Sequence, residues 1–120
     1  MKQQTLLNKN IIITAAADGI GLAIVEYCLN YGANVFLTDV NQKKLSILKK
    51  HPQYNKKLFI KKVKANNPKE VLKYFVDTKK KVRSVDALIN NVGIAGPTGN
   101  IENLDIEEWK NTIDVNINSH

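Results

Sequence analysis

The sequence predicts an α/β fold in which helices cover both faces of a partial doubly wound parallel sheet. Short β-branched apolar runs alternate along the chain with longer segments of helical periodicity. A small-residue turn with two glycines follows the first apolar run, and no repeat, linker or low-complexity stretch divides the chain. Right-handed crossovers then give the strand order 3-2-1-4. We therefore expect one domain over residues 1–120.

The first half of the chain shows two strands around one helix. The isoleucines at 11–13 form a β-branched run bounded by small residues, which predicts a strand buried on both faces. Apolar residues recur at helical spacing from Gly19 through Cys28, and Gly32 is placed to end that helix. Residues 35–38 are predicted to form the second strand, which Asp39 closes.

A second helix and an edge strand follow. Residues 41–50 place Leu45 and Leu48 on one helical face, and Lys43 and Lys44 are expected to point outward into solvent. Residues 58–63 predict a third strand, and its two lysines, at 61 and 62, favour an edge position.

The last third of the chain repeats the alternation. Pro68 begins a predicted helix over residues 68–82, whose apolar face contains Val71, Leu72, Phe75 and Val76. A fourth strand is expected over residues 85–89, followed by a small-residue loop. Asp105, with Glu108 three positions later, resembles a capping box and predicts a helix from Ile106 toward the chain end.

Composition excludes several classes of function. The net charge of +7 comes from 17 lysines and one arginine against 11 carboxylates, and we expect a solvated basic face rather than a nucleic-acid partner. The single cysteine, Cys28, excludes a disulfide framework and favours a reduced, cytoplasmic setting. No signal peptide or membrane span is predicted. His51 and His120 have no partner at metal-ligand spacing, so we expect no metal site and a surface role for each.

The candidate binding residues follow the ends of the predicted strands. The segment TAAADGIG, residues 14–21, lies where a helix N-terminus and glycines let backbone amides approach a pyrophosphate, as in a Rossmann-like fold. Asp39 follows Gly21 by 18 residues, close to the spacing of a carboxylate that binds the adenosine ribose. Two simpler interpretations remain open: glycines that serve only turn geometry, and a carboxylate that only closes a turn.

The segment resembles the Thr-Gly-x-x-x-Gly-x-Gly fingerprint of the short-chain dehydrogenase/reductase family, with Ala15 in place of the first glycine. If the turn needs a positive φ at Ala15, its Cβ costs about 1 kcal/mol. The resemblance implies NAD as cofactor and assigns the first part of the cofactor site to Thr14, Ala15, Asp18, Gly19, Ile20, Gly21 and Asp39.

Further motifs extend the resemblance from Ile11 to Asn118. Asn90-Asn91-Val92-Gly93 is similar to the family's Asn-Asn-Ala-Gly motif, which implies that Asn90, Asn91 and Gly93 border the adenosine side of the cofactor. After the third strand the family often carries an Asp and an apolar residue that contact adenine. Here Lys64 and Ala65 hold those positions, so only a backbone contact from Ala65 is expected, and Lys64 is as readily a surface residue.

The resemblance also assigns Asn116, after Trp109, to the catalytic set, where its backbone carbonyl would help to hold a water. By itself, an asparagine in a helix is a surface or kink residue. The family's Tyr-x-x-x-Lys pair is absent, because the residues four positions after Tyr27, Tyr31, Tyr54 and Tyr74 are Tyr31, Val35, Leu58 and Thr78.

We therefore expect a dinucleotide-binding domain truncated before the catalytic segment. The resemblance implies an NAD-dependent oxidoreductase that transfers hydride between nicotinamide and a small-molecule alcohol or carbonyl, as part of a possible homo-oligomer, with the 120 residues alone inactive. The alternative is a truncated, non-catalytic nucleotide-binding or interaction module.

Overall fold

Four parallel strands form one sheet in the order β3-β2-β1-β4 in the computed structural model, which describes residues 5–93 and 101–118. The strands are β1 (Asn10–Ile13), β2 (Asn34–Asp39), β3 (Leu58–Lys62) and β4 (Ala87–Ile89). In register, Ile12 of β1 lies between Phe36 of β2 and Leu88 of β4. The predicted fold class and strand order are confirmed, and β3 lies at an edge of the described sheet, as its lysines indicated.

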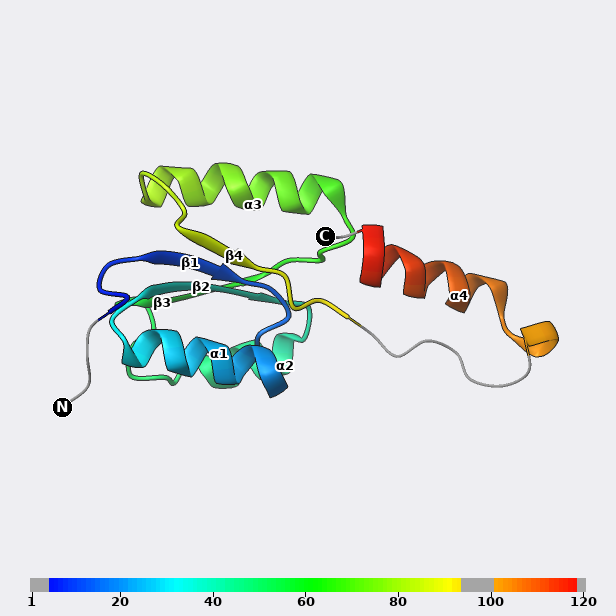
Figure 1. The fold of residues 1–120 in the computed structure, drawn as a ribbon, viewed down its shortest axis with the longest axis horizontal. Coiled ribbons are helices and arrows are strands. Elements are labelled where there is room, and N and C mark those ends of the chain that lie inside the picture. Colours follow the sequence, from blue (N-terminus) through cyan, green and yellow to red (C-terminus); the bar gives the residue numbers. More distant parts are fainter. Residues whose placement is uncertain (1–4, 94–100, 119–120) are drawn as a thin grey trace.

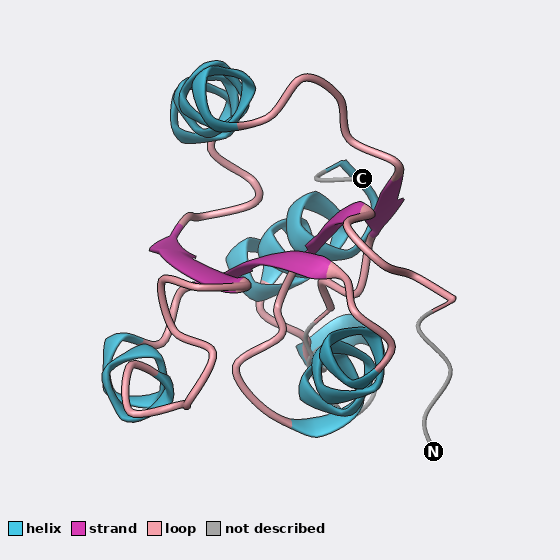
Figure 2. Ribbon diagram, turned by 90° about the vertical axis from the view of Figure 1, so that its left-hand side faces the viewer, coloured by secondary structure: helices cyan, strands magenta, loops and turns pink. Residues whose placement is uncertain are grey.

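Helices cover the two faces of the sheet unequally. Helices α1 (Gly19–Asn30) and α2 (Gln42–Leu48) lie on one face, and α3 (Pro68–Lys81) lies on the other (Figures 1 and 2). A 3₁₀ turn (Ile101–Asn103) precedes α4 (Ile106–Ile113), which continues into a π-helical turn (Asp114–Asn118). Helix α4 lies beyond the edge of the sheet where the strands end (Figure 1). No helix of the described residues is long and apolar enough to cross a membrane.

Side chains cap three of the four α-helices in the described part of the chain. Asn41 accepts a hydrogen bond from the Lys44 amide at the start of α2, and Asn67 accepts from the amides of Lys69 and Glu70 at the start of α3. Asp105 accepts from two first-turn amides of α4, as its position in the sequence predicted. Asp18 occupies the same position before α1 but makes no capping hydrogen bond.

The core lies mainly between the sheet and helices α1 and α2. Its fully buried side chains include Ile13, Val25, Leu37, Leu45 and Leu58. Each such side chain contributes about 1.5–3 kcal/mol of transfer free energy. Cys28 is buried in this cluster, and burial raises the pKa of its thiol.

The apolar face predicted for α3 is largely exposed. Leu72, Phe75 and Val76 are exposed, whereas Thr78 is the buried residue of this helix. Periodicity shows that apolar residues share a face, but it does not show which element covers that face. Leu72 remains 67% exposed and Val76 47% exposed.

His51 has a structural role rather than the expected surface role. Its Nε2 lies 3.0 Å from Oε1 of Glu26 on α1, and its Nδ1 accepts a 3.0 Å hydrogen bond from the Gln53 amide. The ring is half-buried and joins α1 to the segment after α2. His120, and the loop over residues 94–100, lie outside the described residues.

Candidate functional site

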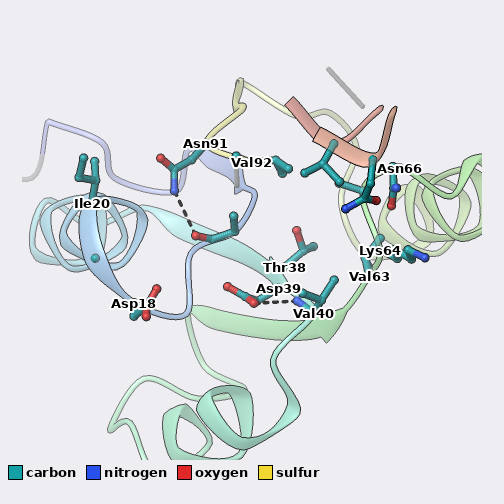
Figure 3. Close-up of a pocket in the computed structure, with 16 residues that line it drawn as sticks. Asp18, Ile20, Thr38, Asp39, Val40, Val63, Lys64, Asn66, Asn91 and Val92 are labelled. Carbon is teal, nitrogen blue, oxygen red and sulfur yellow. Dashed lines mark hydrogen bonds between the residues drawn. The ribbon is translucent and has the colours of Figure 1, made fainter. Parts of the chain in front are cut away.

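A cleft of about 670 Å³ opens at the carboxyl ends of the strands (Figure 3). It lies where the strand order reverses between β1 and β4, the position at which doubly wound sheets bind ligands. Its walls come from the turn before α1, the ends of β2, β3 and β4, and helix α4. The lining residues are Ala15, Asp18, Gly19, Ile20, Thr38, Asp39, Val40, Val63, Lys64, Ala65, Asn66, Asn91, Val92, Gly93, Asn111 and Val115.

The turn before α1 depends on two left-handed backbone positions. Ala15 has φ of 51° and Gly19 has φ of 59°. A Cβ at Gly19 would meet no atom within 4 Å, so glycine serves the backbone conformation there rather than a close contact. At Ala15 the positive φ confirms that the turn carries a strained residue where the family has glycine.

Gly21 serves a close approach instead. A Cβ on Gly21 would lie 2.6 Å from Nδ2 of Asn91 and 2.8 Å from the carbonyl oxygen of Ala15. These two groups are hydrogen bonded to each other, because Nδ2 of Asn91 donates to the Ala15 carbonyl at 3.1 Å (Figure 3). The Asn91 amide also donates to Oγ1 of Thr14 at 3.0 Å. Thr14 and Gly21 therefore support the wall of the cleft, although neither is among the residues that line it.

Asp39 lines the cleft and closes a turn at the same time. One carboxylate oxygen, Oδ1, accepts from the amides of Val40 at 2.7 Å and Asn41 at 3.0 Å. The other, Oδ2, accepts from the Ala17 amide at 3.0 Å, which ties β2 to the turn before α1. The turn-closing interpretation of Asp39 is thus correct. Since a carboxylate offers about four acceptor sites, capacity remains for a ligand hydroxyl.

Lys44 reaches across to the turn before α1, which corrects the expectation that it faces outward. Its ammonium forms a hydrogen-bonded ion pair with Oδ2 of Asp18, 26 residues earlier in the chain. The hydrogen bond to Asp18 raises the pKa of Lys44, and the negative charge of Asp39 adds to that increase. Helical periodicity placed Lys44 outside the apolar face of α2, but a long side chain can reach across to a neighbouring element.

The far wall of the cleft joins β3 to the end of α4. Nδ2 of Asn66 donates a 2.7 Å hydrogen bond to Oδ2 of Asp114. Asn116 lies nearby, with Oδ1 3.6 Å from the position of a Cβ on Gly93. Lys64 is exposed, with its side chain directed away from the cleft in Figure 3, and its amide donates to Glu70.

The cleft gathers most of the residues predicted from the sequence. The predicted residues that line it are Ala15, Asp18, Gly19, Ile20, Asp39, Ala65, Asn91 and Gly93. Thr14, Gly21, Asn90 and Asn116 do not line it. Sequence reasoning missed Asn66, Asn111 of α4 and Val115 of the π-helical turn that follows α4.

Comparison with known proteins identifies the family. The sequence pattern described as short chain dehydrogenase matches residues 9–120. The chain belongs to the short chain dehydrogenase family. An uncharacterized oxidoreductase of Staphylococcus saprophyticus is 33% identical over 114 residues, 93% of this chain and 48% of that protein. The 3beta-hydroxysteroid dehydrogenase 2 of Eggerthella lenta is 31% identical over 115 residues, 95% of this chain and 44% of that protein.

Solved structures support the same fold. A short chain dehydrogenase from Shigella flexneri, complexed with NADP, superposes with a TM-score of 0.86 at 22% identity, over 98% of this chain and 51% of that one. The chain thus spans about half the length of the short chain dehydrogenases that it matches.

Proposed function

We propose that this chain forms the cofactor-binding part of an oxidoreductase that transfers hydride between NAD and an alcohol or carbonyl carbon. The observation that supports this function best is the cleft itself. It brings the turn before α1, Asp39 and the Asn91–Gly93 segment together at the point where the strand order reverses.

The residues of the cleft fit a nicotinamide dinucleotide. The first-turn amides of α1 face the pyrophosphate, because the first amides of a helix have no partner within it and its N-terminus attracts anions. Asp39 accepts hydrogen bonds from the adenosine ribose, and Ala65 contacts the adenine edge through its backbone. Asn90 and Asn91 border the adenosine, and Asn91 also fixes the turn through Ala15.

The chemical step needs more than cofactor binding. When bound, NAD would supply the hydride acceptor for oxidation of an alcohol carbon, and the hydroxyl proton would have to pass to a base. The 120 residues contain no Tyr-x-x-x-Lys pair to take that proton. In this proposal the backbone carbonyl of Asn116, beside Gly93, holds a water of the proton path. The 120 residues alone bind the cofactor without turning over substrate, so on their own they behave as the non-catalytic module considered above.

The setting of the protein is part of the proposal. A reduced cytoplasmic location is supported by the single, buried Cys28. The basic residues are 17 lysines and a single arginine, and this composition supports a small-molecule substrate rather than a nucleic acid. Homo-oligomer formation is supported by the exposed apolar side chains of α3 and β4.

Calorimetric titration of the purified 120-residue chain with NAD and with NADP tests the proposed site. We expect saturable binding and, in amide NMR spectra, ligand-induced shifts at Gly19, Ile20 and Gly21. Asn55, at the opposite end of the structure from the cleft, is the internal reference and should not shift. A folded chain that binds neither dinucleotide contradicts the proposal.

The same protein is then assayed for formation of reduced nicotinamide with a panel of alcohols, including a 3β-hydroxysteroid. We expect no turnover above a protein-free control, because no positioned base supports the departing proton. Enzyme-dependent turnover would show that other residues of this chain supply the base.

A further inference from the structure

Asp18 is the exception among the residues that precede the α-helices. Aspartate is among the preferred residues at this position, because its carboxylate accepts hydrogen bonds from the first-turn amides. Asn41, Asn67 and Asp105 all make such bonds in this chain. Asp18 has the extended backbone of a capping residue, with φ of −156°, yet its side chain caps nothing.

The ion pair with Lys44 accounts for the orientation of Asp18. The carboxylate of Asp18 is bonded to the ammonium of Lys44, which reaches it from the first turn of α2. The backbone of Lys44 is itself fixed, because its amide donates a 3.0 Å hydrogen bond to the side chain of Asn41. The lysine stem therefore starts from a defined point and draws the Asp18 carboxylate away from the N-terminus of α1.

We infer that Lys44 is a positioning residue of the proposed dinucleotide site: by holding the carboxylate of Asp18, it leaves the first-turn amides of α1 open to the pyrophosphate. This inference rests on the proposed function. Lys44 does not need to contact the cofactor, and it does not line the cleft. Asp18 does line it, and as the residue directly before α1 it can reach the first-turn amides once its carboxylate is released.

Removal of Lys44 releases Asp18 to cap α1. The carboxylate then occupies the amides that a phosphate needs, and it places a negative charge beside an anionic ligand. A phosphate must displace the cap before it binds. We expect Lys44→Met to weaken the affinity for ADP by about three- to tenfold, the range set by the strength of a typical capping bond. The affinity for adenosine, which lacks phosphate, should be unchanged.

A four-protein cycle separates this role from simple attraction between Lys44 and phosphate. The proteins are the parent chain, Lys44→Met, Asp18→Ala and the double variant, each titrated calorimetrically with ADP and with adenosine. If Lys44 acts through Asp18, the double variant binds ADP as tightly as Asp18→Ala does, because no carboxylate remains to cap the helix. If Lys44 attracts the phosphates directly, the double variant binds ADP more weakly than Asp18→Ala by the same factor that separates Lys44→Met from the parent, which overturns the inference.

Amide NMR gives a readout that a loss of stability would not produce. In Lys44→Met, the amide protons of Ile20 and Gly21 should exchange more slowly with solvent than in the parent, because they donate to the released Asp18 carboxylate, and this protection should be absent from the double variant. Equal exchange rates in the parent and Lys44→Met overturn the inference. A parent chain that binds neither ADP nor NAD overturns the proposed function as well, while parent binding with an unchanged Lys44→Met affinity overturns this inference alone.

Discussion

The side-chain amide of Asn91 donates a hydrogen bond to the carbonyl oxygen of Ala15, and the missing side chain of Gly21 leaves room for it. This contact joins the segment after β4 to the turn before α1 across 76 residues of sequence. It also connects the two motifs that resemble the family's sequence patterns, residues 14–21 and 90–93. The wall of the cleft therefore depends on one glycine that no ligand needs to touch.

Gly21→Ala should destabilise the protein by about 1–3 kcal/mol, the usual range for overpacking a tight site. The added Cβ would lie 2.8 Å from two backbone atoms, Ala15 O and Ala16 Cα, as well as 2.6 Å from Nδ2 of Asn91. Gly93→Ala is the matched control, since among the described residues its Cβ would meet only Oδ1 of Asn116, at 3.6 Å. Urea unfolding measures both, and equal losses in the two variants would refute the close-approach role of Gly21.

Ala15→Gly should stabilise the protein by about 0.5–1 kcal/mol. The backbone of Ala15 has φ of 51°, where a Cβ is strained, and removing it outweighs the added freedom of the unfolded chain. Ala17→Gly is the control, because Ala17 is buried and does not have a positive φ, so its loss should be destabilising. Thermal unfolding distinguishes the two, and a lower midpoint for Ala15→Gly would contradict the strain.

Tyr74 should make the fold sensitive to strongly alkaline pH. Burial raises its pKa to about 12, against an opposing hydrogen bond from Thr78. Because the folded pKa exceeds the unfolded value near 10, the contribution is complete below about pH 10 and is lost as the pH rises toward 12. Two pKa units set an upper bound of about 2.7 kcal/mol.

Comparison of the parent with Tyr74→Phe isolates this effect, since the lysines titrate in both proteins. The free energy of unfolding, measured by urea at several pH values, should fall more steeply for the parent between pH 10 and 12. Parallel curves would show that Tyr74 ionises as freely in the folded state as in the unfolded state.

The exposed apolar face of α3 and β4 should make the chain associate. Leu72 is 67% exposed, Val76 and Leu88 are about half exposed, and the outer edge of β4 pairs with no described strand. Leu72→Lys with Val76→Lys should reduce the concentration-dependent increase in mass seen by sedimentation. Ile47→Lys on α2, at an equally exposed site on the opposite side of the sheet, is the control. A parent chain that stays monomeric at all concentrations would refute the prediction.

The sequence predicted the sheet well because strand burial leaves a direct signal. The runs Ile11–Ile13 and Val35–Leu37 are apolar without interruption, as strands covered on both faces must be, and the strand order follows from the handedness of the crossovers. The sequence did not predict the side-chain pairs that join distant segments. Lys44 and Asp18 are separated by 26 residues, as His51 and Glu26 are by 25, and neither spacing has a helical or strand period.

The candidate site was predictable where backbone geometry demands a residue type. Gly19 and Gly21 were identified because a left-handed turn and a close contact both exclude a Cβ. The sequence did not predict that Asn66, Asn111 and Val115 line the cleft. They line it because α4 and the turn after it lie against the end of β3, and tertiary contacts such as the Asn66–Asp114 hydrogen bond fix that position. No local pattern reports such a contact.

Asp39 should make the chain prefer NAD to NADP. A carboxylate that accepts from the 2′-hydroxyl of the ribose loses that hydrogen bond when the 2′ position carries phosphate, and it then faces a like charge. At about 4 Å and an effective dielectric constant near 20, one pair of unit charges repels by roughly 4 kcal/mol before screening. Lys44 reduces this repulsion, because its ammonium is attracted electrostatically to the carboxylate of Asp39. A residual of about 1.4 kcal/mol still gives tenfold discrimination.

Titration of both dinucleotides against the parent and Asp39→Ala measures this preference. The affinity ratio should fall toward one in the variant, even if both affinities decrease, because the turn bonds of Asp39 to Val40 and Asn41 are lost for both ligands alike. Glu26→Ala removes a carboxylate that does not line the cleft and should leave the ratio unchanged. Family membership does not decide the outcome, since the Shigella flexneri structure holds NADP. Equal affinities in the parent, or the same ratio in Asp39→Ala, would remove Asp39 from the ribose site.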